Sequence, residues 1–388
     1  MKKMDKINWL HDLDQLKNDL PKLHKKDIAT NNPAFYTQIE TLKQNIENLR
    51  MYEIIMEFSK IVATVNDAHT AVMLPRTHRI PFDCYVFCEG VFITQTDEKN
   101  THLIHCNIIA IEKTPIQEIL EKLTEIIPHE NMQFVLSSIP TDLVCADILY
   151  GLNIITNPKN IMVTLQNRKG KISQHNFAPI KYADYVAFES KIDTLPLYRR
   201  NTDLYYWSHF EKGIFYINYN KCRDMPTQTV ERFCEGLKSF LANNQEVEKI
   251  VIDLRNNKGG NSELFSPFLN WLVHDKRLKE QTIKLYVFVG RDTFSSALLN
   301  TYFLKFESNA VFVGEPTGGK PNCYGEVKYF DLESSRLIIR YSTNYYDIIE
   351  DDSQLSFLPD VYCKVSIEDY INSIDPCMEL IKENKRDI

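Results

Sequence analysis

The sequence lacks the patterns that mark several classes of protein. Its nine cysteines include no CxxC pair and are odd in number, which fits neither a disulfide framework nor a zinc knuckle, so we expect reduced thiols and no metal. Lys and Arg residues form no basic stripe and the formal net charge is -7, so nucleic acid is not an expected partner. No apolar run approaches the roughly 20 residues that a membrane-spanning helix needs.

The N-terminal stretch also lacks the pattern of a leader peptide. It starts with positive charge, but polar residues interrupt the apolar run that a signal peptide requires, namely Asp5, His11, Asp12 and Asp14. We therefore expect a cytoplasmic protein, although an exported form whose leader had been removed would look the same. The composition, 44% hydrophobic and 25% charged, is that of a globular protein, and 388 residues allow two or three domains.

Three segments differ in their hydrophobic pattern and predict three domains. Residues 1–79 carry apolar side chains at helical spacing, which predicts an N-terminal helical cap. Residues 80–204 contain short alternating runs, a helix entered through Pro115 and a closing hairpin, which predict a small β-rich module and a linker. Residues 205–388 alternate apolar strands with helices, which predicts a mostly parallel sheet covered by helices and an α/β fold class.

Ligands bind at the carboxyl ends of the strands in such sheets, so the loops that follow three strands form the candidate site. The loop DLRNNKGGNSE places Gly259 and Gly260 just before a helix, where bare N–H groups suit an anion or oxyanion. The loop VGRDTFSSALL places Ser295 and Ser296 at the start of the next helix. The loop VGEPTGGKPNCYGE places Lys320 after a glycine pair.

Each loop taken singly has an ordinary structural explanation. Thr293, Ser295 and Ser296 stand where Ser and Thr usually cap a helix. A glycine pair between strand and helix usually serves the turn, and a lone loop lysine is usually a solvated charge. Ser296 nevertheless follows a parallel strand with a helix dipole behind it, so an oxyanion on a bound acyl group would meet the N–H of Ala297.

Together the three loops resemble a known family. The segments IDLRNNKGG, TFSSA and GEPTGGK occur in the order found in S41 peptidases, the group of the C-terminal processing (tail-specific) proteases and the tricorn-like proteases. The segment DAHT and the stretch FLPDVYCKVSIEDYINSIDPCMELI extend the resemblance from Asp67 to Ile381. It implies a ClpP and crotonase-like spiral core, and a serine endopeptidase that cleaves peptides or proteins through an acyl-enzyme with no metal or organic cofactor.

The resemblance also implies roles for individual residues. Ser296 would be the nucleophile. The N–H groups of Ala297 and of either Gly259 or Gly260 would form the oxyanion hole. Many relatives assemble into oligomers, so a homo-oligomer is a candidate assembly.

Two residues compete for the role of general base. Lys320 corresponds to the base of the processing proteases, but it must lose a proton that lysine normally keeps at neutral pH. His69, in DAHT, corresponds to the base of the tricorn-like group and needs almost no such adjustment, or it ties the helical cap to the core. We favour Lys320 and keep His69 open; Glu326, Glu350 or Asp352 would then orient His69.

The segment from Ile80 to Val163 stands where many relatives carry a PDZ domain, and IIAIEKTPIQEIL resembles the PDZ strand and helix. The sequence departs from that pattern at His105, Cys106 and Asn107, where a glycine of the carboxylate-binding turn is expected. Two other functions stay open. One is a catalytically silent relative that binds peptides or lipophilic ligands, and the other is a crotonase-like acyl-CoA enzyme, for which no adenine-binding signature is visible.

Overall fold

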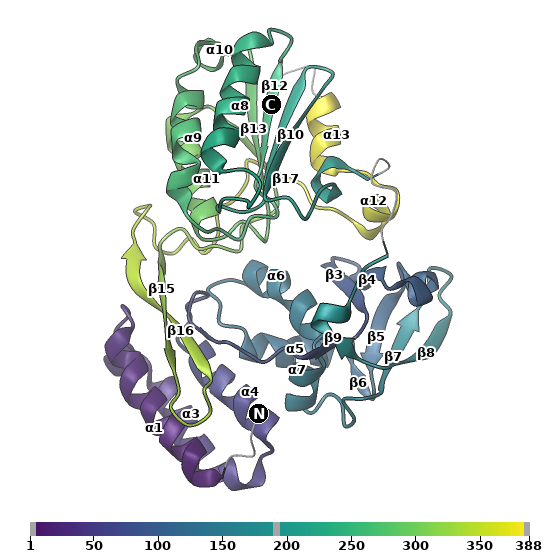
Figure 1. Cartoon of the computed structure of the whole chain (residues 1–388), viewed down its shortest axis with the longest axis vertical. Coiled ribbons are helices and arrows are strands. Elements are labelled where there is room, and N and C mark those ends of the chain that lie inside the picture. Colours follow the sequence, from purple (N-terminus) through teal and green to yellow (C-terminus); the bar gives the residue numbers. More distant parts are fainter. Residues whose placement is uncertain (1–4, 189–194, 384–388) are drawn as a thin grey trace. The chain divides into compact units, whose positions relative to one another are not determined.

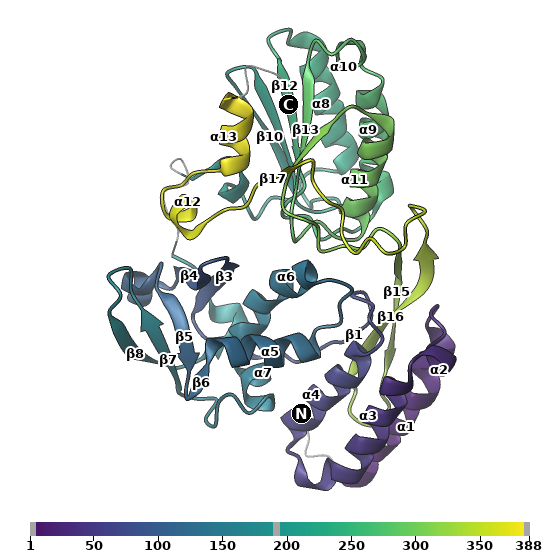
Figure 2. The ribbon, with the colours of Figure 1, turned by 180° about the vertical axis from the view of Figure 1, so that it is seen from behind.

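The computed structural model describes residues 5–188 and 195–383 (Figures 1 and 2). The chain divides into two compact units, with boundaries at residues 189/190, 321/322 and 347/348. The first unit therefore combines the N-terminal half of the chain with a segment from much later in the sequence. None of the helices in the two described ranges is long and apolar enough to cross a bilayer.

Amphipathic helices form the start of the first unit. They are α1 (Lys6–Leu23), α2 (Ile28–Asn31), α3 (Pro33–Asn45) and α4 (Met51–Ala63). Asp5, Asp27 and Asn32 cap the first three, because each side chain accepts a hydrogen bond from a backbone N–H of the first turn. Their apolar faces meet in one core that includes Leu13 and Phe58, so helices occur where the sequence spacing predicts them.

An antiparallel sheet and three helices complete most of the first unit. The strands run in the order β3 (Phe82–Phe87), β4 (Gly90–Thr96), β5 (Asn107–Ile111), β7 (Ile161–Gln166) and β8 (Ile172–Phe177), with β6 (Thr114–Pro115) beside β5. The helices are α5 (Ile116–Ile126), α6 (Met132–Leu143) and α7 (Ala146–Gly151). Two strands, β2 (His78–Arg79) and β9 (Ile180–Lys181), pair separately. The predicted closing hairpin is thus β7 and β8.

The sequence predicts one domain, a mostly parallel sheet covered by helices, for residues 205–388. A hairpin from inside this segment belongs to the first unit instead. Its strands β15 (Cys323–Asp331) and β16 (Ile338–Tyr346) form a sheet with β1 (Ala71–Val72), in the order β1-β16-β15. The buried side chains of Leu332 and Ile339 join the core of the helices. Asp12 of α1 accepts the N–H groups of Ser334 and Ser335 at the hairpin turn, at 2.8 and 2.7 Å.

The second unit is built on one sheet. Its strands run in the order β10 (Tyr206–Glu211), β11 (Ile214–Tyr219), β12 (Lys249–Asp253), β13 (Lys284–Val289), β14 (Val311–Gly314) and β17 (Val361–Tyr362). Only the β10–β11 pair of this sheet is antiparallel. One core packs one face of the sheet against α8 (Val230–Asn243), α9 (Ser266–Val273) and α11 (Ser296–Glu307). A second core joins the other face to α13 (Pro376–Glu383).

Two short helices, α10 (Lys276–Lys279) and α12 (Ile367–Ile371), lie in the connections of this unit. Cover on both faces explains why strands such as KLYVFV are almost continuously apolar. The mixed α/β class and the alternation of strand and helix are confirmed.

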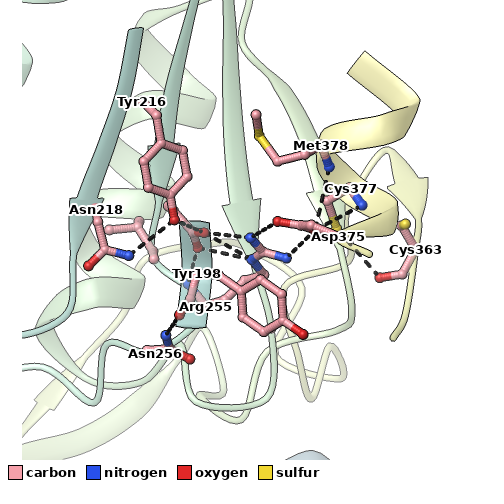
Figure 3. A network of polar contacts seen from close by, with 12 residues as sticks. Tyr198, Tyr216, Asn218, Arg255, Asn256, Cys363, Asp375, Cys377 and Met378 are labelled. Carbon is pink, nitrogen blue, oxygen red and sulfur yellow. Dashed lines mark hydrogen bonds and ion pairs between the residues drawn. The ribbon is translucent and has the colours of Figure 1, made fainter. Parts of the chain in front are cut away.

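A buried charge cluster attaches α13 to the sheet (Figure 3). Arg255 follows β12, and its guanidinium nitrogens lie 2.6 Å from Asp253 and 2.8 Å from Asp375. Tyr216 donates to Asp253 at 2.6 Å, and Asp375 accepts the N–H of Cys377 at the start of α13. Burial by itself would lower the pKa of Arg255, but the two carboxylates raise it well above its usual value.

We predict that Arg255→Ala destabilises the fold by about 3–5 kcal/mol, because it leaves two carboxylates buried without their cation. Urea unfolding followed by far-ultraviolet circular dichroism measures the change. The matched control is Lys305→Ala, which removes an ion pair to Asp360 of similar length, 2.8 Å, whose side chains are 42% and 39% exposed. We expect the control to cost less than about 1 kcal/mol. Equal effects of the two substitutions would contradict a supporting role for the buried cluster.

Candidate active site

Ser296 is the first residue of α11, beyond the carboxyl end of β13. The preceding residue, Ser295, has a φ of +53°, a backbone conformation that non-glycine residues rarely adopt and that persists where the surrounding structure enforces it. The Ser296 side chain is largely buried, and its Oγ donates a hydrogen bond to the carbonyl of Gly260 at 2.7 Å. The structure therefore brings together the serine and the glycine turn that the sequence selected.

The glycine turn approaches its neighbours too closely for any side chain. A Cβ atom at Gly260 would lie 2.2 Å from the carbonyl oxygen of Cys222, and one at Gly259 would lie 2.7 Å from the Cβ of Ser295. Both glycines also have positive φ, +100° for Gly259 and +138° for Gly260. Glycine at position 259 is thus required for the contact with the loop that precedes Ser296 (residues 290–295, the serine loop), and glycine at position 260 for the contact with Cys222.

The three N–H groups expected to bind an oxyanion differ in their present partners. Gly259 N–H donates to the side-chain oxygen of Asn257 at 2.9 Å, and Ala297 N–H donates to the carbonyl of Phe294 at 3.1 Å. Among the residues that the structure describes, none accepts from Gly260 N–H. The sequence leaves Gly259 and Gly260 as alternative oxyanion donors, and of these two Gly260 presents the open N–H.

Lys320 lies in the same unit as Ser296, in the loop after β14. Its Nζ donates to Asp352 at 2.8 Å; the Lys320 side chain is 15% exposed and that of Asp352 is 65% exposed. Asp352, expected to orient His69, thus pairs with the competing base, and Glu350 is exposed to solvent. Because Nζ of Lys320 is engaged by Asp352, this contact would have to open before Nζ could face Ser296.

His69 lies in the first unit, in the turn between α4 and β1, where it is buried. Burial lowers the pKa of His69 to about 4, and Arg340 adds to the decrease while Asp67 opposes it. Arg340 donates to the carbonyl of His69 at 2.7 Å. Glu326, another residue expected to orient His69, instead accepts a hydrogen bond from Tyr346.

Sequence reasoning did not single out Asp67 as a carboxylate beside His69. Its Oδ1 lies 3.8 Å from Nδ1 of His69, and it accepts hydrogen bonds from His24 at 2.9 Å and from Ser342 at 2.7 Å. Burial would raise the pKa of Asp67, but the bonds from His24, Ser342 and Thr70 outweigh it and hold the pKa well below its usual range. The sequence feature that points to Asp67 is its position in DAHT, two residues before His69.

No metal site is evident among the side chains of residues 5–188 and 195–383, since no group of three or more His, Cys, Asp or Glu is arranged to hold an ion. The positions that the structure brings close together are Ser296 with Gly260, and Lys320 with Asp352.

Known structures with the same arrangement of elements exist. Mature CPAF superimposes with a TM-score of 0.67 at 12% sequence identity, covering 99% of both chains. Mature CPAF complexed with lactacystin gives a TM-score of 0.69 at 12% identity over 97% of both chains. At this level of identity the likeness establishes the fold. A search of curated protein sequences gives no match.

The family comparison indicates a peptidase. Residues 213–361 match the sequence profile of peptidase family S41. The matched segment includes Gly259, Gly260, Ser296 and Lys320, whereas His69 lies outside it.

We predict that His69 makes the fold less stable in acid. The unfolded chain binds a proton at His69 below pH 6.5, whereas the folded chain binds it only near pH 4. The free energy of unfolding therefore keeps its full contribution from His69 above pH 6.5 and loses it as the pH falls to 4. The difference between these two pKa values corresponds to about 3 kcal/mol. Urea unfolding of wild type and His69→Gln at pH 7 and pH 4 measures this, and the variant should lose about 3 kcal/mol less than wild type.

The control is His11→Gln, which removes an imidazole that is 54% exposed. It should lose as much stability on acidification as wild type. An equal loss in His69→Gln and wild type would refute the assignment of the acid sensitivity to His69.

Proposed function

We propose that the protein is a serine endopeptidase that hydrolyses peptides or proteins through an acyl-enzyme on Ser296. The observation that carries this proposal is the contact between Ser296 Oγ and the Gly260 carbonyl at 2.7 Å, beside a Gly260 N–H that none of the described residues occupies. A carbonyl attacked by Ser296 would develop its negative charge next to this N–H and the start of α11. The site thus offers a nucleophile and an oxyanion donor side by side.

The proposed reaction begins with a rotation of the Ser296 hydroxyl. Its proton now points to a carbonyl that cannot accept it as a base, so the hydroxyl must turn toward a basic nitrogen. Loss of that proton accompanies the formation of the bond between Oγ and the substrate carbonyl carbon. The base then returns the proton to the leaving amine, and water hydrolyses the ester in a second, equivalent cycle.

Lys320 is the base that we favour. It shares the second unit with Ser296, its side chain is mostly buried, and it lies within the matched family segment. The alternative is His69, which burial keeps neutral at pH 7, the form in which an imidazole accepts a proton. Asp67 is then the carboxylate that would orient it.

The finer features of the fold are part of the same proposal. We propose that the sheet of the second unit is a ClpP and crotonase-like core, and that the antiparallel sheet β3–β8 is a PDZ-like module. The alternation of parallel strands and helices in the second unit supports the first assignment, and the succession of β5 and α5 in the segment IIAIEKTPIQEIL supports the second.

We predict that a fluorophosphonate probe labels the wild-type protein on Ser296 and fails to label Ser296→Ala. Intact-mass and peptide mass spectrometry identify the modified residue. The matched control is Ser266→Ala, a serine at the start of another helix of the same unit, whose hydroxyl bonds to a helix carbonyl at 3.0 Å. This control should be labelled like wild type. A folded wild type that resists the probe would count against the proposed nucleophile.

We predict that Lys320→Ala lowers the rate at which Ser296 reacts with the fluorophosphonate probe about 10²–10⁴-fold, because general-base catalysis contributes that much. The labelling reaction is stopped at timed intervals, from pH 5 to pH 10, to measure this rate for Lys320→Ala and His69→Ala in parallel. If His69 has only a structural role, its variant should lose stability but keep most of its rate. Near wild-type labelling of Lys320→Ala would remove Lys320 as the base and favour His69.

A further inference from the structure

Thr293 stands at the centre of the three loops that carry the proposed active site. Its side chain is fully buried, and its hydroxyl donates to the carbonyl of Leu254, at the start of the glycine loop, at 2.9 Å. The same hydroxyl accepts the N–H of Gly290 at 3.0 Å, and Thr293 N–H returns a bond to the Gly290 carbonyl at 2.8 Å. The Thr293 hydroxyl therefore makes one bond within the serine loop, to Gly290, and one to the residue that follows the neighbouring strand β12, Leu254.

The main chain of Thr293 reaches the third loop. Its carbonyl accepts the N–H of Gly319, the residue before Lys320, at 3.2 Å. The loops are packed closely at this point, because a Cβ at Gly319 would lie 2.8 Å from Leu298 and 3.4 Å from the Cα of Phe294. Thr293 is thus bonded both to the loop after β12, which carries Gly259 and Gly260 (the glycine loop), and to the loop after β14, which carries Lys320 (the lysine loop).

A second bond makes this connection rigid. Phe294 N–H donates to the carbonyl of Asn257 at 3.1 Å, and Asn257, also fully buried, holds Gly259 N–H through its side chain. Two successive residues of the serine loop, Thr293 and Phe294, therefore bond to the glycine loop just before the chain turns into Ser295 and Ser296. The direction in which Ser296 leaves this turn depends on both bonds.

We propose that Thr293 is a positioning residue for catalysis: its hydroxyl sets the placement of Ser296 relative to Gly260 and to the loop of Lys320. The inference rests on the proposed function of Ser296. Thr293 itself does not contact the reacting atoms and acts only through the loops that it joins. A displacement of about 1 Å in a reacting group lowers rates about 10²-fold, so loss of these bonds should slow acylation more than it weakens binding.

The test compares three substitutions that separate the hydroxyl from the rest of the side chain. Thr293→Val keeps the shape and removes the hydroxyl, and Thr293→Ser keeps the hydroxyl and removes the methyl group. Thr293→Cys keeps a weaker donor at similar volume and replaces the valine variant in the comparison if circular dichroism shows that the latter does not fold. The control is Thr96→Val, which removes the hydroxyl of a fully buried threonine in β4 of the first unit, bonded to a carbonyl at 3.0 Å.

The readout is fluorophosphonate labelling of Ser296 at several probe concentrations, which separates the maximal rate from the probe concentration at half that rate. We expect Thr293→Val to lower the maximal rate at least about tenfold with less than about a threefold change in the half-saturating concentration. Thr293→Ser should stay within about threefold of wild type, and Thr96→Val should match wild type even where its melting temperature falls.

Three outcomes would overturn the proposal. The first is a maximal labelling rate for Thr293→Val equal to that of wild type. The second is a maximal rate for Thr293→Ser as low as that for Thr293→Val. The third is a fall in the maximal rate of Thr96→Val as large as that of Thr293→Val. The second would assign the effect to packing of the methyl group, and the third to general destabilisation. A folded wild type that is not labelled at all would remove the proposed function of Ser296 itself, a result distinct from these three.

Discussion

The parallel pairing of β12, β13 and β14 is the constraint on which the candidate site depends. Asp253 is the Cα partner of Phe288, and Val289 is the partner of Gly314, so the chain leaves three adjacent strands at one edge of the sheet. Backbone bonds from Leu254 to Phe288 and from Glu315 to Val289 continue the ladder into the loops. Gly260 and Ser296 therefore meet although they are 36 residues apart in sequence.

Register brings the loops together, but buried polar side chains decide how they fit. Asn257, Thr293 and Thr317 are each fully buried, and each bonds to the main chain of its own loop or of a neighbouring segment. A buried polar group is costly without a partner, so alternative loop arrangements that break these bonds are disfavoured. The two glycines add a steric condition, because a Cβ at Gly259 would clash with Ser295 and one at Gly260 with the carbonyl of Cys222.

Local sequence patterns predicted the strands and helices of the second unit and the meeting of Ser296 with Gly260, because periodicity and strand order are local properties. They did not predict that residues 322–347 pack with the N-terminal helices, since a polar and aromatic hairpin carries no sign of its partner. The bond from Ser342 to Asp67 spans 275 residues and that from Arg255 to Asp375 spans 120. Such distant pairs leave no pattern in a single sequence, although Arg255 lies two residues after β12 and Asp67 four residues after α4.

Under the proposed mechanism, both reactive side chains rest in contacts that catalysis must break. Ser296 donates to a carbonyl and Lys320 to Asp352. A neutral hydrogen bond contributes about 1 kcal/mol net, and an ion pair with an exposed carboxylate about 0–1 kcal/mol. One oxyanion donor contributes about 3–4 kcal/mol in the transition state. Breaking the two resting contacts therefore costs less free energy than one correctly placed N–H contributes to transition-state stabilisation. The position of Gly260 relative to Ser296 should thus affect the rate more than the resting partners of Ser296 and Lys320 do.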